Sequence, residues 1–85
     1  MILHVDEMKH LEGYRLLLTF NNGESGTVDL NGLLEGEVFA PLNDPESFAT
    51  ARLDPLFKTV VWSNGADMAP EYLLDLVREQ ARRAA

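Results

Sequence analysis

The chain has 85 residues, 46% of them hydrophobic and 25% charged, and it contains no cysteine. This composition is typical of one small globular domain, and so short a chain buries only about 60–65% of the surface it exposes when unfolded, which leaves no room for a deep catalytic cavity. The formal net charge of −7 argues against nucleic acid and anionic membranes as direct partners, because both attract clustered Lys and Arg.

The first part of the chain is predicted to form an antiparallel sheet. Apolar residues recur with period two from residue 3 and slip by one position at residue 8, which predicts a strand with a bulge near residues 6–7. Strict alternation over residues 14–20 predicts the clearest strand. The Asn-Gly pair at 22–23 favours a type I′ turn, so residues 14–30 are predicted to form a β-hairpin.

Short helical segments are predicted between this hairpin and residue 50. Asp29 is expected to cap a helical turn over residues 30–34, and the segment EVFAPL is predicted to be irregular. Asp44 is a good helix N-cap because a proline follows it at the first helical position. The sequence therefore predicts a helix of one or two turns that carries Phe48 into the core.

Two further strands are predicted at residues 52–53 and 59–62, followed by a turn at Asn64-Gly65. Pro70 opens the last helix, in which Leu73, Leu76 and Val77 form the predicted buried stripe. Leu17 and Leu74 are expected to point away from the buried faces, which would leave them free for a contact between molecules.

The predicted fold is a two-layer α+β domain. It combines a mainly antiparallel sheet with short helical inserts and a C-terminal helix packed on one face. Residues 1–85 are expected to form a single domain, with residues 81–85 as a frayed tail. The first ten residues include acids and a lysine, unlike a signal peptide, and no apolar run approaches membrane-spanning length. We therefore expect a cytoplasmic protein.

The stretch VVWSNGADMAPEYL, residues 60–73, is the densest motif in the chain. It supplies a candidate binding patch of Trp62, Asn64, Asp67 and Tyr72. Each residue type also has a local structural reason to stand there, because Asn-Gly turns the chain and Asp67 can help to cap the following helix. A tight corner between a strand and a helix is thus the favoured interpretation, and a ligand-binding loop is the alternative.

A metal site is the second candidate, at His4, Asp6 and His10. In a regular strand His4 and Asp6 would share a face, but the predicted bulge leaves His10 uncertain and no fourth ligand is recognisable. The serines lie in turn-like or capping contexts, and no phosphate-binding loop is present in the sequence. We therefore expect no catalytic residues, no metal and no cofactor, and a protein that is not an enzyme.

Three segments together carry a family resemblance. YRLLLTFNNGESGTVDL, LLEGEVFAPLNDPESF and VVWSNGADMAPEYL occur in this order and resemble the bacterial family catalogued as domain of unknown function 2442, from about residue 3 to 74. The resemblance implies a small two-layer α+β domain without an established activity. The chain differs from the usual family pattern at Ser63, where proline is common, and at Ala69, where a polar cap is common.

The resemblance also bears on partners. Some family members carry an added helix-turn-helix domain, and others are encoded beside another small uncharacterised domain, which has prompted the suggestion of a toxin–antitoxin pair. This chain ends soon after its last predicted helix, so we expect no helix-turn-helix module.

Three functions remain open at this point. The favoured one is a non-enzymatic protein–protein interaction module, in one form the antitoxin-like member of a two-gene pair. Its partner would be another small protein, although a small core also makes a homo-oligomer an option. The alternatives are a small-molecule or metal-binding domain that uses the Trp62–Asp67 corner, and a DNA-associated regulator that acts only through a partner.

Overall fold

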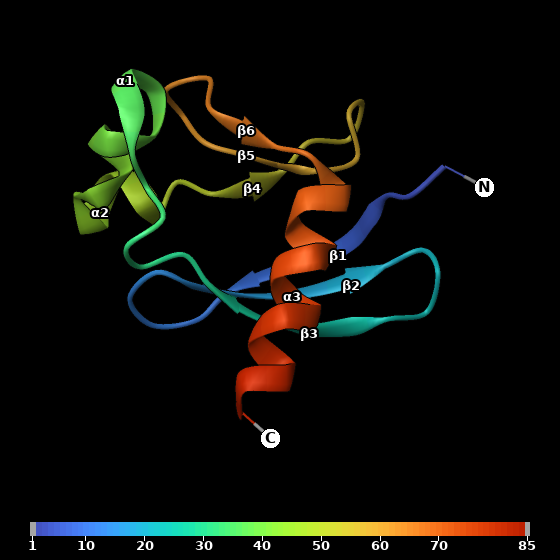
Figure 1. Cartoon of the computed structure of the whole chain (residues 1–85). Helices are drawn as coiled ribbons and strands as arrows, with labels where there is room; N and C mark the ends of the chain where they lie inside the picture. The colour runs from blue at the N-terminus through green and yellow to red at the C-terminus, as the bar shows by residue number, and fades with distance from the viewer. Residues whose placement is uncertain (1, 85) are drawn as a thin grey trace.

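The computed structural model describes residues 2–84, which form two antiparallel sheets, three short helical segments and a long C-terminal helix (Figure 1). The strands are β1 (Val5–His10), β2 (Arg15–Phe20), β3 (Ser25–Asp29), β4 (Arg52–Leu53), β5 (Val60–Val61) and β6 (Asp67–Met68). The helices are α1 (Gly36–Phe39), the 3-10 helix η1 (Ala40–Asn43), α2 (Pro45–Phe48) and α3 (Pro70–Ala84). The predicted α+β class is confirmed. No helix within residues 2–84 is both long and apolar enough to cross a membrane.

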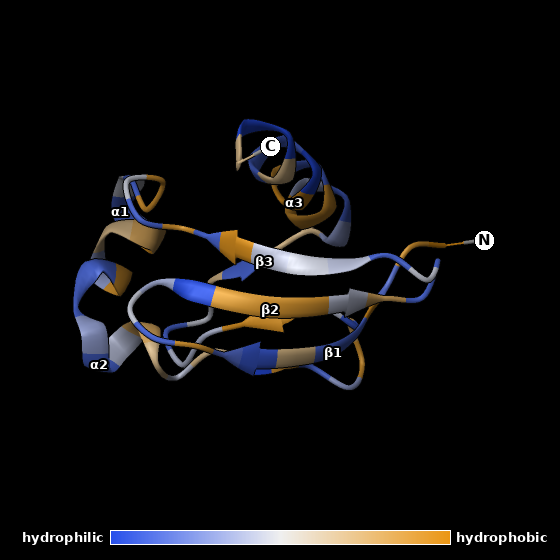
Figure 2. Ribbon diagram, turned by 90° about the horizontal axis from the view of Figure 1, so that it is seen from below, coloured by the Kyte–Doolittle hydropathy of each residue, from blue (hydrophilic) through white to orange (hydrophobic). Residues whose placement is uncertain are grey.

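The first sheet has the strand order β1-β2-β3 and the second has the order β4-β5-β6. In the first sheet, Val5 pairs with Phe20 but Glu7 pairs with Thr19, so the register shifts by one residue between them. This confirms the predicted bulge. Figure 2 shows hydrophobic β2 between the more polar β1 and β3, with α3 lying beside β3.

The turn between β2 and β3 differs from the prediction. The Gly23 N–H donates to the Phe20 carbonyl at 3.1 Å, and the Phe20 N–H donates to the Glu24 carbonyl at 2.8 Å. Gly23 has φ +90°, whereas Asn22 keeps a negative φ. The loop is therefore a three-residue type I turn closed by a glycine bulge, and the predicted two-residue type I′ turn is wrong. The Asn22 side chain instead accepts the Glu24 N–H at 3.0 Å.

The inserts between the sheets are partly as predicted. Asp44 caps α2 by accepting the Ser47 N–H at 3.1 Å, and Phe48 is fully buried, so both expectations are confirmed. The predicted helical turn over residues 30–34 is wrong: residues 31–32 form a turn in which the Leu33 N–H donates to the Leu30 carbonyl at 3.0 Å, and the Asp29 carboxylate accepts the Asn31 N–H at 3.0 Å. The segment predicted to be irregular contains α1 and η1.

The core joins both sheets, the inserts and α3 in one cluster of buried side chains. On α3 the buried residues are Leu73, Leu74 and Val77, while Leu76 is half-buried against the cluster. The expectation that Leu74 points away from the buried face is wrong, because α3 follows β6 almost directly and also packs against β3, which widens its buried face. Leu17 is 40% exposed on the outer face of the first sheet, as expected.

Helix α3 approaches β3 very closely at Gly26. A Cβ atom at Gly26 would lie 2.6 Å from Cγ1 of Val77, well inside van der Waals contact. Next along the helix, Arg78 forms a bidentate ion pair with Glu24, through Nε at 3.0 Å and a terminal nitrogen at 2.5 Å. Residue 26 must therefore be glycine for the helix to lie in this place.

One turn further on, Gln80 binds the backbone of β3. Its side-chain oxygen accepts the Asp29 N–H at 2.8 Å, and its side-chain nitrogen donates to the Asp29 carbonyl at 2.9 Å. The helix then continues through Ala84, so residues 81–84, which were expected to fray, are helical. Ala85 lies outside the described residues.

Candidate functional site

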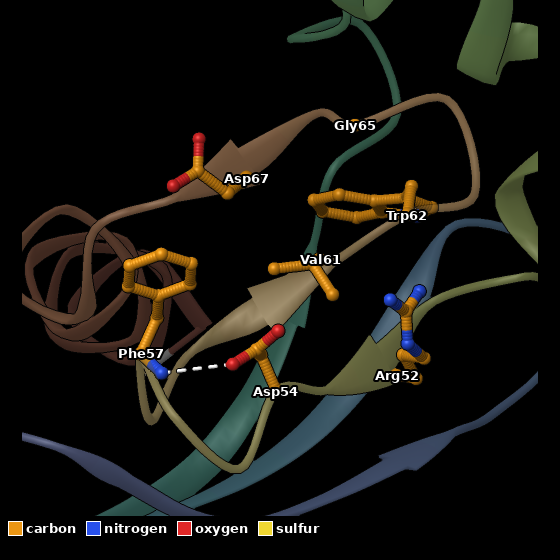
Figure 3. Close-up of a pocket in the computed structure, with 7 residues that line it drawn as sticks. All are labelled: Arg52, Asp54, Phe57, Val61, Trp62, Gly65 and Asp67. Carbon is orange, nitrogen blue, oxygen red and sulfur yellow. Dashed lines mark hydrogen bonds between the residues drawn. The ribbon is translucent and has the colours of Figure 1, made fainter.

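The outer face of the second sheet carries an open pocket of about 240 Å³ (Figure 3). Its lining comes from all three strands and from the loops at their ends: Arg52, Asp54, Phe57, Val61, Trp62, Gly65 and Asp67. Three of these residues form one row across the sheet, because Val61 pairs with Arg52 on one side and with Asp67 on the other. Directly paired residues share a face, so these side chains all point into the pocket.

The loop between β4 and β5 is held in shape by Asp54. Its Oδ1 atom accepts the N–H groups of Leu56 and Phe57, each at 2.8 Å, and its carbonyl accepts the Lys58 N–H at 2.9 Å. Lys58 has a positive φ of 56°, and its own carbonyl accepts the Val5 N–H at 2.9 Å. The loop is thus tied both to itself and to the start of β1.

This ordered loop displays two large apolar side chains. Leu56 is 79% exposed and Phe57 is 66% exposed, which makes the loop an apolar tip. We refer to Leu56 and Phe57 as the hairpin tip. Such exposure of two neighbouring apolar side chains, next to a pocket with charged walls, is typical of a contact surface.

The same backbone contacts lower the pKa of the Asp54 carboxyl below its ordinary value of 3.8. The Phe57 N–H contributes most, the Leu56 N–H next, and the positive charge of Arg52 adds to the effect. A carboxyl that is held ionised in this way stabilises the fold only while it carries its charge.

We therefore expect the folded protein to lose stability on acidification through Asp54. Because the folded-state pKa is depressed, the contribution is complete above 3.8 and is lost as the pH falls through the lower folded pKa. Asp54→Asn should be less stable than the wild type at neutral pH, and the difference should shrink below pH 3.8. Urea unfolding across the pH range measures this difference. A difference that stays constant in acid would contradict the assignment.

Of the four residues of the sequence-derived patch, Trp62 and Asn64 have structural roles. Trp62 is 1% exposed, its indole N–H donates to the Phe48 carbonyl at 3.1 Å, and it also lines the pocket. The Asn64 side chain donates to the Val38 carbonyl at 2.9 Å and accepts the Ala66 N–H at 3.0 Å. Both residues fix the corner in place.

The other two residues of the patch lie apart. Asp67 belongs to β6, a strand that the sequence did not predict, and it lines the pocket. Among residues 2–84, no hydrogen bond joins its carboxylate to the start of α3, so the expected help with helix capping is not found. Tyr72 is 45% exposed on α3 and is not part of the pocket lining.

Sequence reasoning missed Arg52, Asp54 and Phe57. A signal was available in the segment DPLFK, because Asp-Pro favours a turn and two large apolar residues at a hairpin tip point to solvent. The position of Arg52 opposite Val61 had no such signal, since it depends on the register of strands only two residues long.

The structure does not assemble the candidate metal ligands. The His10 ring packs on Phe48 with centroids 5.5 Å apart, and its Nε2 atom hydrogen-bonds to the Gly13 carbonyl at 2.9 Å. His4 is held by Asn21 through its backbone, and Asp6 is exposed at the bulge. Across residues 2–84, no group of three or more His, Asp or Glu side chains is arranged to hold a metal ion.

Comparisons with known proteins place these features in a family context. The family model described as "Protein of unknown function (DUF2442)" matches residues 5–79. The fold is similar to the crystal structure of "Putative DNA Binding Protein NE0471" from Nitrosomonas europaea ATCC 19718, with a TM-score of 0.80 and 27% sequence identity. The match covers 95% of this chain and 52% of that chain, so this chain spans about half the length of that protein. No curated protein matches the chain.

Proposed function

The chain belongs to the DUF2442 family of proteins of unknown function, and we propose that it is a non-enzymatic module that binds another small protein through the hairpin tip and the adjoining pocket. The observation that carries this proposal is the exposure of Leu56 and Phe57, 79% and 66%, on a loop that is already ordered. A preordered loop loses little conformational entropy when it binds, so more of its contact energy becomes affinity.

The chemistry of the pocket supports binding over catalysis. Asp54 directs one carboxylate oxygen to two backbone N–H groups, and its pKa is lowered. A general acid or base that works near neutral pH needs a pKa close to that pH, which for a carboxyl means a raised value. Asp54 is therefore suited to a fixed negative charge and not to proton transfer.

The charge of the chain indicates which partner fits. At −7, two copies of the chain repel each other, whereas a basic protein is attracted over a distance and oriented by the acidic surface. We propose a small basic protein as the partner, and an antitoxin-like pairing is one form of this proposal.

Affinity capture from the native host, with variants of the hairpin tip, tests the proposal. The wild type should recover a stoichiometric partner, which is then identified by mass spectrometry and purified for binding measurements. Phe57→Ser and Leu56→Ser should lose that partner while keeping the wild-type melting temperature, because both side chains are exposed.

The matched control is Val38→Ser, which removes an apolar side chain that is 51% exposed on α1. This variant should bind the partner as the wild type does. Recovery of no stoichiometric partner, or equal binding by the tip variants and the control, would contradict the proposed interaction.

A second candidate is a DNA-associated regulator that acts only through a partner. It is favoured by the similarity to a solved structure described as a DNA binding protein, of which this chain covers 52%. Two of the three arginines of α3 are already paired, Arg78 with Glu24 and Arg83 with Glu79, which leaves Arg82 as the one α3 arginine in none of the ion pairs within residues 2–84.

Gel-shift assays at low salt test this second candidate. The isolated chain should give no shifted band, and a band should form only after the captured partner is added. Tight binding of DNA by the chain alone would overturn the argument from charge.

A further inference from the structure

Building on the proposed interaction function, we propose that the pocket holds a cationic side chain, Lys or Arg, that the partner protein inserts beside Phe57. The pocket has two ends with different chemistry. Phe57 and Asp67 lie toward one end and Arg52 toward the other, with Val61 and Asp54 between them (Figure 3). The cation is assigned to the end that carries Phe57 and Asp67.

Two carboxylates are available for that cation. Among residues 2–84, neither Asp54 nor Asp67 takes part in an ion pair. Asp54 uses Oδ1 for the N–H groups of the loop, which leaves its second oxygen open. Asp67 is exposed and carries its carboxylate on the outer face of β6. Both carboxylates line the pocket, and such acceptors match the several N–H donors of a guanidinium or an ammonium group.

The apolar surface at this end suits the same ligand. Phe57 lines the same end of the pocket as Asp67, and the quadrupole of an aromatic ring attracts a cation bound beside it. Val61 forms the floor of the pocket at the centre of the row. The methylene groups of a Lys or Arg side chain can cover Val61 while the charged group reaches the acids.

Arg52 sets the direction of the bound segment. It belongs to none of the ion pairs within residues 2–84, and its side chain lies below Trp62 at the end away from Phe57 (Figure 3). It repels a cation at its own end and is free to donate to a carbonyl or carboxylate of the partner. The pocket therefore accepts a segment that places a positive charge and an acceptor on opposite sides of Val61.

A small probe tests the pocket without the partner. The probe is N-acetyl-L-arginine amide, titrated into the whole chain and followed by two-dimensional amide NMR, and the neutral isostere N-acetyl-L-citrulline amide is the comparison. We expect saturable shifts at Asp54, Phe57 and Asp67 with the arginine probe at millimolar concentrations. The citrulline probe should bind roughly five- to tenfold more weakly, as expected for the loss of one exposed charge interaction.

Substitutions in the pocket identify the side chains that bind the arginine probe. Asp67→Asn should weaken the arginine probe roughly fivefold and leave the citrulline probe unchanged. Asp75→Asn removes an exposed acid from α3, outside the pocket, and should change neither. Phe57→Leu keeps an apolar side chain but removes the aromatic ring, and should also weaken the arginine probe. Unchanged spectra away from the pocket show that each variant is folded.

Three outcomes would overturn the assignment. These are equal binding of both probes, an unchanged affinity in Asp67→Asn, and free L-arginine binding at least tenfold more tightly than the blocked probe. The last result would assign the pocket to a zwitterionic small molecule. The outcome of the affinity capture does not depend on the outcome of these probe titrations. A partner recovered through the hairpin tip with no preference for the arginine probe would leave the interaction function standing and remove the cation site.

Discussion

Replacing Trp62 by alanine is expected to lower the free energy of unfolding by about 3–5 kcal/mol, the usual cost of emptying a buried aromatic site. Trp62 is 1% exposed and its ring centroid lies 5.8 Å from that of Phe48. A small domain has a total stability of only about 5–15 kcal/mol, so this variant should lose a large share of its stability and unfold at a much lower urea concentration than the wild type. Urea unfolding followed by far-ultraviolet circular dichroism measures the change.

Trp62→Phe separates the indole hydrogen bond from the packing. Phenylalanine keeps most of the apolar volume but removes the indole donor that lies 3.1 Å from the Phe48 carbonyl, which still accepts the Ala51 N–H at 3.1 Å. The expected loss from the hydrogen bond is about 0.5–1.5 kcal/mol, smaller than for alanine. If Trp62→Ala costs less than about 1 kcal/mol, below the usual range for such a change, the side chain is not part of the core and would return as a candidate for binding.

Gly26→Ala is expected to destabilise the protein by about 1–3 kcal/mol through overpacking. The added Cβ would lie 2.6 Å from Cγ1 of Val77, a β-branched residue whose side chain has little freedom in a helix. In an ordinary strand the same change would stabilise, because glycine weakens strand interiors. Differential scanning calorimetry, or urea unfolding, gives the sign directly.

A double mutant isolates the cause. If the steric contact is responsible, Gly26→Ala combined with Val77→Ala should be more stable than the sum of the two single losses predicts. Ser25→Ala, an exposed neighbour on β3, should change the stability by less than about 0.5 kcal/mol. Additive losses, or a stabilising effect of Gly26→Ala alone, would contradict the close approach of α3 to β3.

Features with a local cause could be predicted from the sequence. The Asp44 cap requires only Asp44 and the N–H of Ser47, and the bulge in β1 follows from the slip in the apolar period. Gly65 has φ +89° at the turn where an Asn-Gly pair predicted it. In each case the residues that make the structure lie within a few positions of one another.

Features that depend on distant partners could not be predicted. Strand β6 has two residues, too few for any periodicity, and it exists because β5 offers it an edge. Leu74 is buried on a helix that packs against β3, a distant contact that no helical pattern reveals. The candidate site follows the same rule. Asp67 was picked out as a candidate binding residue that could also help to cap the last helix, but its place in one row with Val61 and Arg52 depends on the register of the second sheet.

The stretch VVWSNGADMAPEYL contains both kinds of feature, those with a local cause and those that depend on distant partners. Trp62 and Asn64 hold the corner in place, because their side chains donate hydrogen bonds to the carbonyls of Phe48 and Val38. Asp67, in the same stretch, faces the pocket. The corner and the pocket surface are therefore both built from this one segment, and no choice between them is needed for the segment as a whole.

The contact between Gln80 and Asp29 has a consequence for self-association. An unpaired strand edge is a template on which another chain can add a strand and start to aggregate. The side-chain amide of Gln80 offers β3 one acceptor and one donor, as a neighbouring strand would, and so blocks part of that edge without a fourth strand. Deamidation to glutamate would replace the donor by an oxygen that repels the Asp29 carbonyl. Slow deamidation of Gln80 would then leave the backbone of the β3 edge open to pairing with another chain.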